Sequence, residues 1–169
     1  MTPIEIDKAM CDITFAIIDE CKERIERADK TNKTEIKALK IEEGMYTMAP
    51  RAGLLSYAKS REGVLETRKN KVLPTILHRY PEIKALYESL GEDEKNIFVA
   101  ALHAELYMRY SFYENNVAEY ARAKETGDAA REFEFSIKVG AMKRIFDAWE
   151  DWRRENDIFP GIFKEENNG

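Results

Sequence analysis

The fold is decided by the stretch ALHAELYMRYSFYENN, residues 101–116. Successive residues of a helix lie about 100° apart around its axis. On that spacing, one apolar stripe contains Val99, Leu102, Leu106, Tyr110, Tyr113, Val117 and Tyr120. A second stripe, nearly opposite, contains Ile97, Ala101, Ala104, Met108 and Phe112. Because a helix that is apolar on two sides is buried on two sides, we expect this segment to lie at the centre of the fold.

Around that helix the sequence predicts an all-α, single-domain helical bundle of about five to seven helices. The chain has 169 residues but only 8 glycines and 5 prolines, the residues that most often form turns. It also lacks the alternating pattern of strands, so the sequence favours a few long helices. Three helices should be long, over about 3–30, 92–124 and 128–156. Residues 1–156 would form the domain, and residues 157–169 a C-terminal tail with a turn in IFPGIF.

Local signals predict where several helices begin. Thr2 can cap the first helix in a capping box with Glu5, and Asp128 can cap the last long helix. A shorter helix up to Gly44 should be capped by Thr34. The prolines at positions 74 and 81 should each begin a separate short helix, because proline suits the first helical turn.

The first helix repeats the two-stripe pattern of the central helix. The last long helix also has a wide apolar face. The three long helices would then offer more apolar surface than one chain readily covers, which indicates contact with another subunit. The alternative is that short helices at 74–90 cover the extra stripes. We expect self-association. The predicted interface, which includes two aromatic residues of the tail, consists of Ile4, Phe15, Ile18, Met108, Phe112, Phe159 and Phe163.

The tail itself allows two interpretations. Its Ile-Phe pairs flank a Pro-Gly turn, so they can fold back onto their own domain or dock on a neighbouring molecule. Only the second arrangement would place Phe159 and Phe163 in an interface between chains.

Basic residues are concentrated in the segment 59–79, although the whole chain has a formal charge of −5. Such a cluster near helix starts can bind phosphate, so the alternative function is a nucleic-acid-associated subunit or regulator that uses residues 59–79. The contacts would be Lys59, Arg61, Arg68, Lys69, Lys71 and Arg79. The simpler interpretation is a solvated basic face that pairs with acidic helices, since the protein as a whole is acidic.

The sequence contains no motif for catalysis or cofactor binding. It lacks glycine-rich phosphate loops, nucleophile elbows and the paired ligand spacing of zinc sites. Neither histidine has a glutamate three residues before it, as a di-iron bundle requires. We expect no metal and no cofactor, and a hydrogen-bonded structural role for His103. The carboxylates of WEDWRREN, residues 149–156, should be solvated.

These features favour a non-enzymatic helical interaction or assembly protein, a type common among subunits of bacterial and phage complexes. Its partner would be another protein or a second copy of itself, with nucleic acid as the second choice. An enzyme whose residues converge from distant positions is a third alternative. Apolar runs are far too short to span a bilayer, and the start of the chain lacks a signal-peptide pattern. We therefore expect no membrane contact and a cytoplasmic location, or a place within a virion for a phage-encoded protein.

Overall fold

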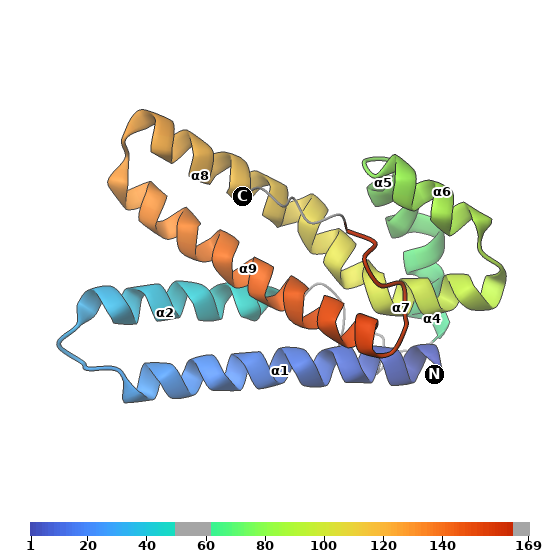
Figure 1. Ribbon diagram of the computed structural model, residues 1–169, viewed down its shortest axis with the longest axis horizontal. Coiled ribbons are helices and arrows are strands. Elements are labelled where there is room, and N and C mark those ends of the chain that lie inside the picture. The colour runs from blue at the N-terminus through green and yellow to red at the C-terminus, as the bar shows by residue number, and fades with distance from the viewer. Residues whose placement is uncertain (50–61, 164–169) are drawn as a thin grey trace.

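The computed structural model describes residues 1–49 and 62–163, and the regular elements in these ranges are all helices (Figure 1). In chain order they are α1 (Pro3–Arg27), α2 (Lys33–Tyr46), α4 (Glu62–Thr67), η2 (Arg68–Val72), α5 (Leu73–Leu77), α6 (Pro81–Ser89), α7 (Glu92–Met108), η3 (Arg109–Tyr113), α8 (Glu114–Thr126) and α9 (Ala129–Glu155). The segments η2 and η3 are π-helical. The predicted all-α fold is confirmed, and α7, η3 and α8 follow one another without a break as the long central helix.

Helix starts at Thr2 and Asp128 follow the predicted caps, whereas both predicted ends of α2 are wrong, since this helix also continues past Gly44 to Tyr46. The Thr2 hydroxyl accepts a hydrogen bond from the Glu5 N–H at 3.2 Å, and the Glu5 carboxylate accepts one from the Thr2 N–H at 3.0 Å. Asp128 caps α9 through the N–H three residues later. The prediction for Thr34 is wrong, because Asn32 caps α2 instead and the helix begins one residue before the threonine.

Pro74 does not begin a separate helix, although Pro81 does begin α6. The segments α4, η2 and α5 form one continuous run in which Pro74 lies in the interior. In a regular helix the proline ring would clash with the carbonyl four residues before it. Here a π turn stands directly ahead of the proline, with the Leu73 N–H bonded to the carbonyl of Arg68. Such a wider turn is a known way to accommodate an interruption within a helix.

The core lies where α1, α7 and α9 meet. In Figure 1, α2 returns antiparallel to α1, α9 packs over both, and α8 returns along α9. Trp149 of α9 is wholly buried, and its indole N–H donates to the Thr14 hydroxyl of α1 at 3.0 Å. That hydroxyl in turn donates to the Met10 carbonyl at 2.8 Å. The buried polar atoms therefore fix how these two helices pack.

The second apolar stripe of the central helix is buried within the chain itself. Ala101, Ala104 and Met108 are buried, and α1, α4, η2 and α5 all pack against α7. The Tyr87 ring of α6 also contacts Phe98, with centroids 5.0 Å apart. These residues of the stripe therefore need no second chain to cover them. Among the described helices, none has the length and apolar character to cross a membrane.

Candidate binding cleft

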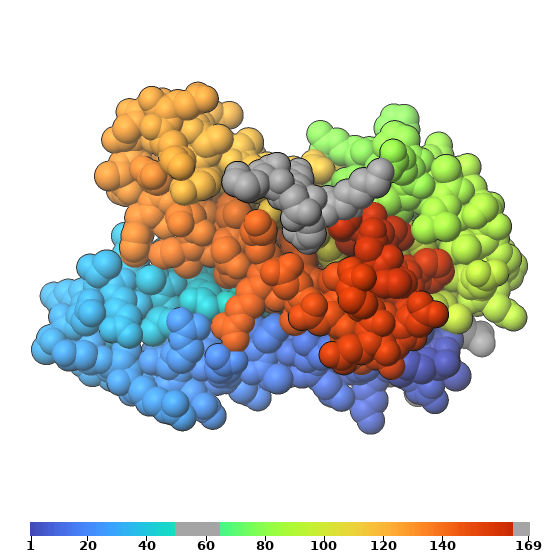
Figure 2. Space-filling view, in the orientation of Figure 1, coloured from blue at the N-terminus to red at the C-terminus, as the bar shows by residue number. Residues whose placement is uncertain are grey.

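A cleft of about 680 Å³ opens between α6, the central helix and α9. In Figure 2 the surface dips between the α8–α9 pair and the side of the molecule formed by α5 and α6. Residues 79–83, at the α5–α6 corner, form one wall. The floor carries Arg109, Tyr113, Glu114 and Val117, α9 contributes Lys143, Phe146 and Asp147, and the tail contributes Ile162 and Phe163.

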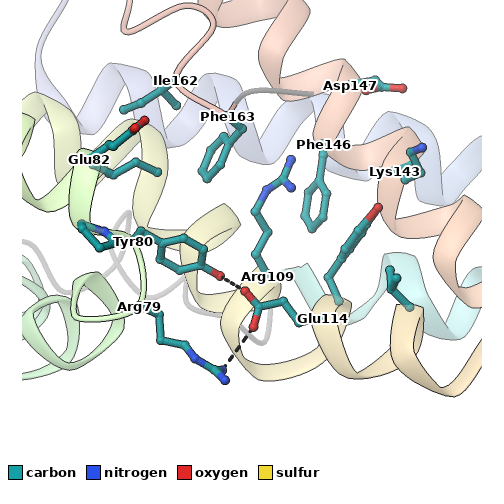
Figure 3. Close-up of a pocket in the computed structure, with 14 residues that line it drawn as sticks. Arg79, Tyr80, Glu82, Arg109, Glu114, Lys143, Phe146, Asp147, Ile162 and Phe163 are labelled. Carbon is teal, nitrogen blue, oxygen red and sulfur yellow. Dashed lines mark hydrogen bonds and ion pairs between the residues drawn. The ribbon is translucent and has the colours of Figure 1, made fainter. Parts of the chain in front are cut away.

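Arg109 lies at the centre of the cleft, as the first residue of the π segment η3. Its Nε and Nη2 atoms are each 2.8 Å from one carboxylate oxygen of Glu105, one turn earlier. Its guanidinium carbon is 4.4 Å from the ring centroid of Phe146 and 4.2 Å from that of Phe163 (Figure 3). Aromatic rings attract a cation electrostatically, so the two rings and the carboxylate hold the arginine in one orientation.

Behind Arg109 lies a buried network of ion pairs. Glu105 is 1% exposed and also binds Arg153, which is wholly buried, at 3.0 Å. Arg153 continues to Glu150 at 2.7 Å, and Glu150 binds the exposed Arg154. Burial raises the pKa of Glu105, and the two arginines oppose that rise. Among the carboxylates of residues 149–156, Asp151 and Glu155 are exposed as predicted, whereas Glu150 is 19% exposed and binds both Arg153 and Arg154. Arg153 itself lies wholly inside the bundle.

Glu114, also on the floor of the cleft, is held by two residues of the wall that the α5–α6 corner forms. The Tyr80 hydroxyl donates to one oxygen at 2.7 Å, and Arg79 Nη1 donates to the other at 3.1 Å (Figure 3). Burial, and then the hydrogen bond to Glu114, raise the pKa of Tyr80. The phenol therefore stays protonated as a donor and ties the corner to the central helix.

The described part of the tail folds back beside the cleft. The Phe159 ring packs edge-on against Phe98 with centroids 5.4 Å apart, and the Gly161 N–H donates to Glu150 at 2.5 Å. Gly161 has φ +69°, a conformation in which glycine carries no steric penalty. Phe159 and Phe163, predicted as interface residues, thus contact their own chain, as in the fold-back interpretation of the tail.

The other predicted interface residues divide into two groups. Ile18 and Met108 are 4% and 0% exposed and belong to the core, and Phe112 is half-buried against Tyr107. Ile18 and Met108 therefore lack the exposed surface that contact with another chain requires, whereas Phe112 keeps part of its surface. Ile4 and Phe15 are 49% and 37% exposed on α1, and they keep such surface.

The residues predicted for nucleic-acid contact are not presented together. Arg68 and Lys69 are buried, and the Lys69 ammonium is 2.7 Å from a carboxylate oxygen of Glu92. Arg79 is exposed but held by Glu114, and Lys71 is exposed. Two further residues of this prediction, Lys59 and Arg61, lie outside the described residues.

His103 is buried and stacks on Tyr107, with ring centroids 6.2 Å apart. The predicted hydrogen bonds are not found, since neither ring nitrogen has a hydrogen-bond partner among the described residues. Burial, and then the charge of Arg68, lower the pKa of His103 to about 3. Cys11 is buried too, and burial above all raises the pKa of its thiol to about 12. Within the described ranges, no three His, Cys, Asp or Glu side chains are placed to hold a metal ion.

The sequence analysis missed the central residue of the cleft. Glu105 and Arg109 stand four residues apart, the spacing of a helical ion pair, and that was the available signal. The partner on α9, Arg153, is 48 residues away from Glu105 and only the tertiary fold brings the two together. The chain matches no family model, and comparisons with curated proteins and with solved structures found no similar protein.

Proposed function

We propose that the chain is a non-enzymatic interaction protein that binds a segment of another protein chain in this cleft. The observation that supports the proposal is the cleft itself, with Arg109 held at its centre between Phe146 and Phe163. Binding sites combine an apolar wall with a few fixed polar groups, and buried aromatic and arginine residues contribute much of the energy of protein interfaces.

The chemistry of the cleft favours binding over catalysis. A general acid or base needs a pKa near the working pH and a free position against the substrate. Tyr80 is instead held protonated against Glu114, and that carboxylate is occupied by Arg79 as well. These groups position the walls of the cleft.

A protein segment is favoured as the occupant because the cleft already accepts peptide side chains. Ile162 and Phe163 of the chain's own tail form one side of it, and the Phe163 ring stacks on Arg109. An incoming segment with similar side chains could extend this packing across the open side, where Val117 is 37% exposed.

The test is selection of peptides from a random display library on the wild-type protein. Val117→Glu places a charge on the apolar floor and should abolish binding of the selected peptides. The matched control is Leu86→Glu, because Leu86 is 36% exposed on the outer surface of α6 and does not line the cleft. Peptides that bind wild type and Leu86→Glu alike but not Val117→Glu support the proposal. An absence of enriched peptides, or equal binding to both variants, would contradict it.

Self-association is the second part of the proposed function, and α1 supports it. Met1, Ile4 and Phe15 are among the large hydrophobic side chains that remain exposed, at 58%, 49% and 37%. Ile4 and Phe15 are 11 positions apart, so they lie about 20° from each other around the helix. A second copy could cover this narrow stripe.

Sedimentation equilibrium measures that association directly. We expect a mass above that of the 19.6 kDa chain at micromolar concentration, and a return to the monomer mass in the double variant Ile4→Glu with Phe15→Glu. Leu86→Glu again serves as the control. A wild-type protein that is monomeric throughout would remove self-association but leave the cleft proposal intact.

A further inference from the structure

The side chains of the cleft that keep free hydrogen-bond donors are mainly positively charged. A guanidinium offers five N–H donors, and Glu105 binds Arg109 only through Nε and Nη2. Its Nη1 donates to no residue in the described part of the chain. Lys143 is exposed on the adjacent face of α9 and, over the same ranges, forms no ion pair. Glu114, by contrast, is already occupied on both oxygens by Tyr80 and Arg79.

The buried network behind Arg109 has an excess of positive charge. It joins three arginines, at positions 109, 153 and 154, to two glutamates, at 105 and 150. Three positive and two negative charges leave one positive charge. The remaining acids of the lining, Glu82 and Asp147, are exposed at the rim, and Figure 3 shows Asp147 pointing away from Arg109.

The same cations stand beside apolar surface. Lys143 precedes Phe146 by three residues, so both project from one face of α9. Phe146 is 2% exposed and only supports Arg109 from beneath, so the accessible apolar surface is that of Val117 on the floor and of the partly buried Phe163. A matching ligand would therefore carry a negative charge directly beside an apolar or aromatic group.

Resting on the proposed function, we infer that the cleft recognises an acidic-aromatic peptide segment, with a carboxylate bound by Arg109 Nη1 and Lys143 and an aromatic ring packed on Val117 and Phe163. A carboxylate that accepts hydrogen bonds from an arginine and a lysine forms the stronger, charge-assisted kind. The arrangement of two fixed rings around the arginine limits where that carboxylate can lie. Charge complementarity is thus combined with an apolar contact.

The experiment is calorimetric titration of the full chain with three matched peptides. The first is acetyl-Leu-Phe-Asp-Leu-Phe-amide, and the others carry Asn or Lys in place of Asp. We expect the Asp peptide to bind about tenfold more tightly than the Asn peptide, the size of effect that a charge-assisted hydrogen bond gives, and the Lys peptide not to bind. Free phenylbutyrate is included because it offers the same carboxylate and ring without a peptide. It should bind at least about tenfold more weakly than the Asp peptide, since it lacks the further side chains.

Lys143→Gln supplies the variant arm, because this exposed side chain can be changed without leaving a buried charge unpaired. It should weaken the Asp peptide about tenfold and leave the Asn peptide unchanged. Lys22→Gln, at an exposed lysine of α1, should change neither.

The outcomes separate the inference from the proposed function. If all three peptides bind equally and Val117→Glu abolishes their binding, the cleft binds peptides but the acidic preference is overturned. If phenylbutyrate binds as tightly as the Asp peptide, the occupant is a small carboxylate and the peptide assignment is overturned. If none of these peptides binds while the display library still yields peptides that Val117→Glu no longer binds, the acidic-aromatic inference is overturned and the proposed function stands. If the library yields none either, both are contradicted.

Discussion

The molecule contains two π-helical segments that each begin with an arginine, and they differ in what that arginine faces. Arg68 of η2 is 5% exposed, within the packing of α1, η2 and α7. Arg109 of η3 is 20% exposed and opens on the cleft. π segments often mark functional sites. Here only the second has its arginine beside an open cavity.

The difference shows that charge density along a sequence does not predict accessible charge. The segment RKNKV of η2 has three basic residues, yet two of them are buried. The segment RYSFY of η3 has one, and it stands at the centre of the cleft. The location of the neighbouring helices decides the outcome, since α1 and α7 close over η2 while α6 and α9 leave a gap beside η3.

The largest expected effect tests the network behind η3. Arg153→Ala should lower the free energy of unfolding by about 3–5 kcal/mol, because it breaks a fully buried ion pair and leaves one oxygen of Glu105 without its donor, with Arg109 as the remaining partner of this carboxylate. Urea denaturation followed by circular dichroism measures this change. Arg154→Ala is the matched control, since the neighbouring arginine binds the same Glu150 but is 62% exposed. It should cost less than about 1 kcal/mol, and similar losses in both variants would contradict the buried role of Arg153.

The second prediction concerns His103, in the interior beside η2, and the pH dependence of the free energy of unfolding. Unfolded histidine has a pKa near 6.5, whereas burial lowers the pKa of His103 to about 3 in the folded chain. Above pH 6.5 the imidazole is neutral in both states and does not make stability depend on pH. Below that pH only the unfolded chain takes up the proton, so stability should fall by about 2 kcal/mol between pH 6.5 and 4.5.

The His103→Leu variant isolates this contribution, because it removes the titrating group from a buried position. Urea midpoints at several pH values should fall less steeply for this variant than for wild type. His78→Leu, at an exposed position, should follow the wild-type slope. Parallel slopes for wild type and His103→Leu would show that the imidazole is not buried as described.

A smaller effect distinguishes the two lysines of η2. Lys69→Ala should lower the free energy of unfolding by about 1 kcal/mol, because it removes the hydrogen bond between the buried Lys69 ammonium and the mostly exposed Glu92. Lys71→Ala, at an exposed position, should change stability by less than about 0.5 kcal/mol. Thermal melts of both variants provide the measurement. Equal effects would indicate that the two side chains are equally exposed, as a phosphate-binding face would require.

The smallest expected effect on stability is at the cleft floor. Val117→Ser should change the free energy of unfolding by less than about 0.5 kcal/mol, since the side chain is already exposed. The same change should weaken binding of the acidic-aromatic peptide, while Leu86→Ser should not. A loss of stability of 1 kcal/mol or more would mean that Val117 is part of the core rather than of a free surface.

Sequence reasoning predicted the framework better than the site. The two-stripe pattern of residues 97–120 correctly indicated burial along α7, because periodicity reports burial on each side. It was wrong for Val117, which is 37% exposed beyond the π segment. It could not show which of the chain's own helices bury the second stripe, since that depends on tertiary packing. The stripe therefore suggested an external partner for Met108, which is wholly buried.

The cleft was harder to predict because its residues come from four separate parts of the chain. Arg79, Arg109 and Phe146 are far apart in sequence, and each alone fits a surface or core role. The carboxylates of residues 149–156 were expected in solvent since most helical charges are there. Only the fold reveals that Arg153 pairs with Glu105 inside the bundle.

The most direct test of the central claim is to locate peptide binding by amide chemical shifts. Nitrogen-15-labelled protein would be titrated with the acidic-aromatic peptide, and the shifts compared between the regions around η3 and η2. The account predicts the largest changes at residues 109–117 and 143–147, with residues 68–72 unchanged. Changes centred on 68–72 or on α1, with the cleft unaffected, would contradict the claim that the cleft is the binding site.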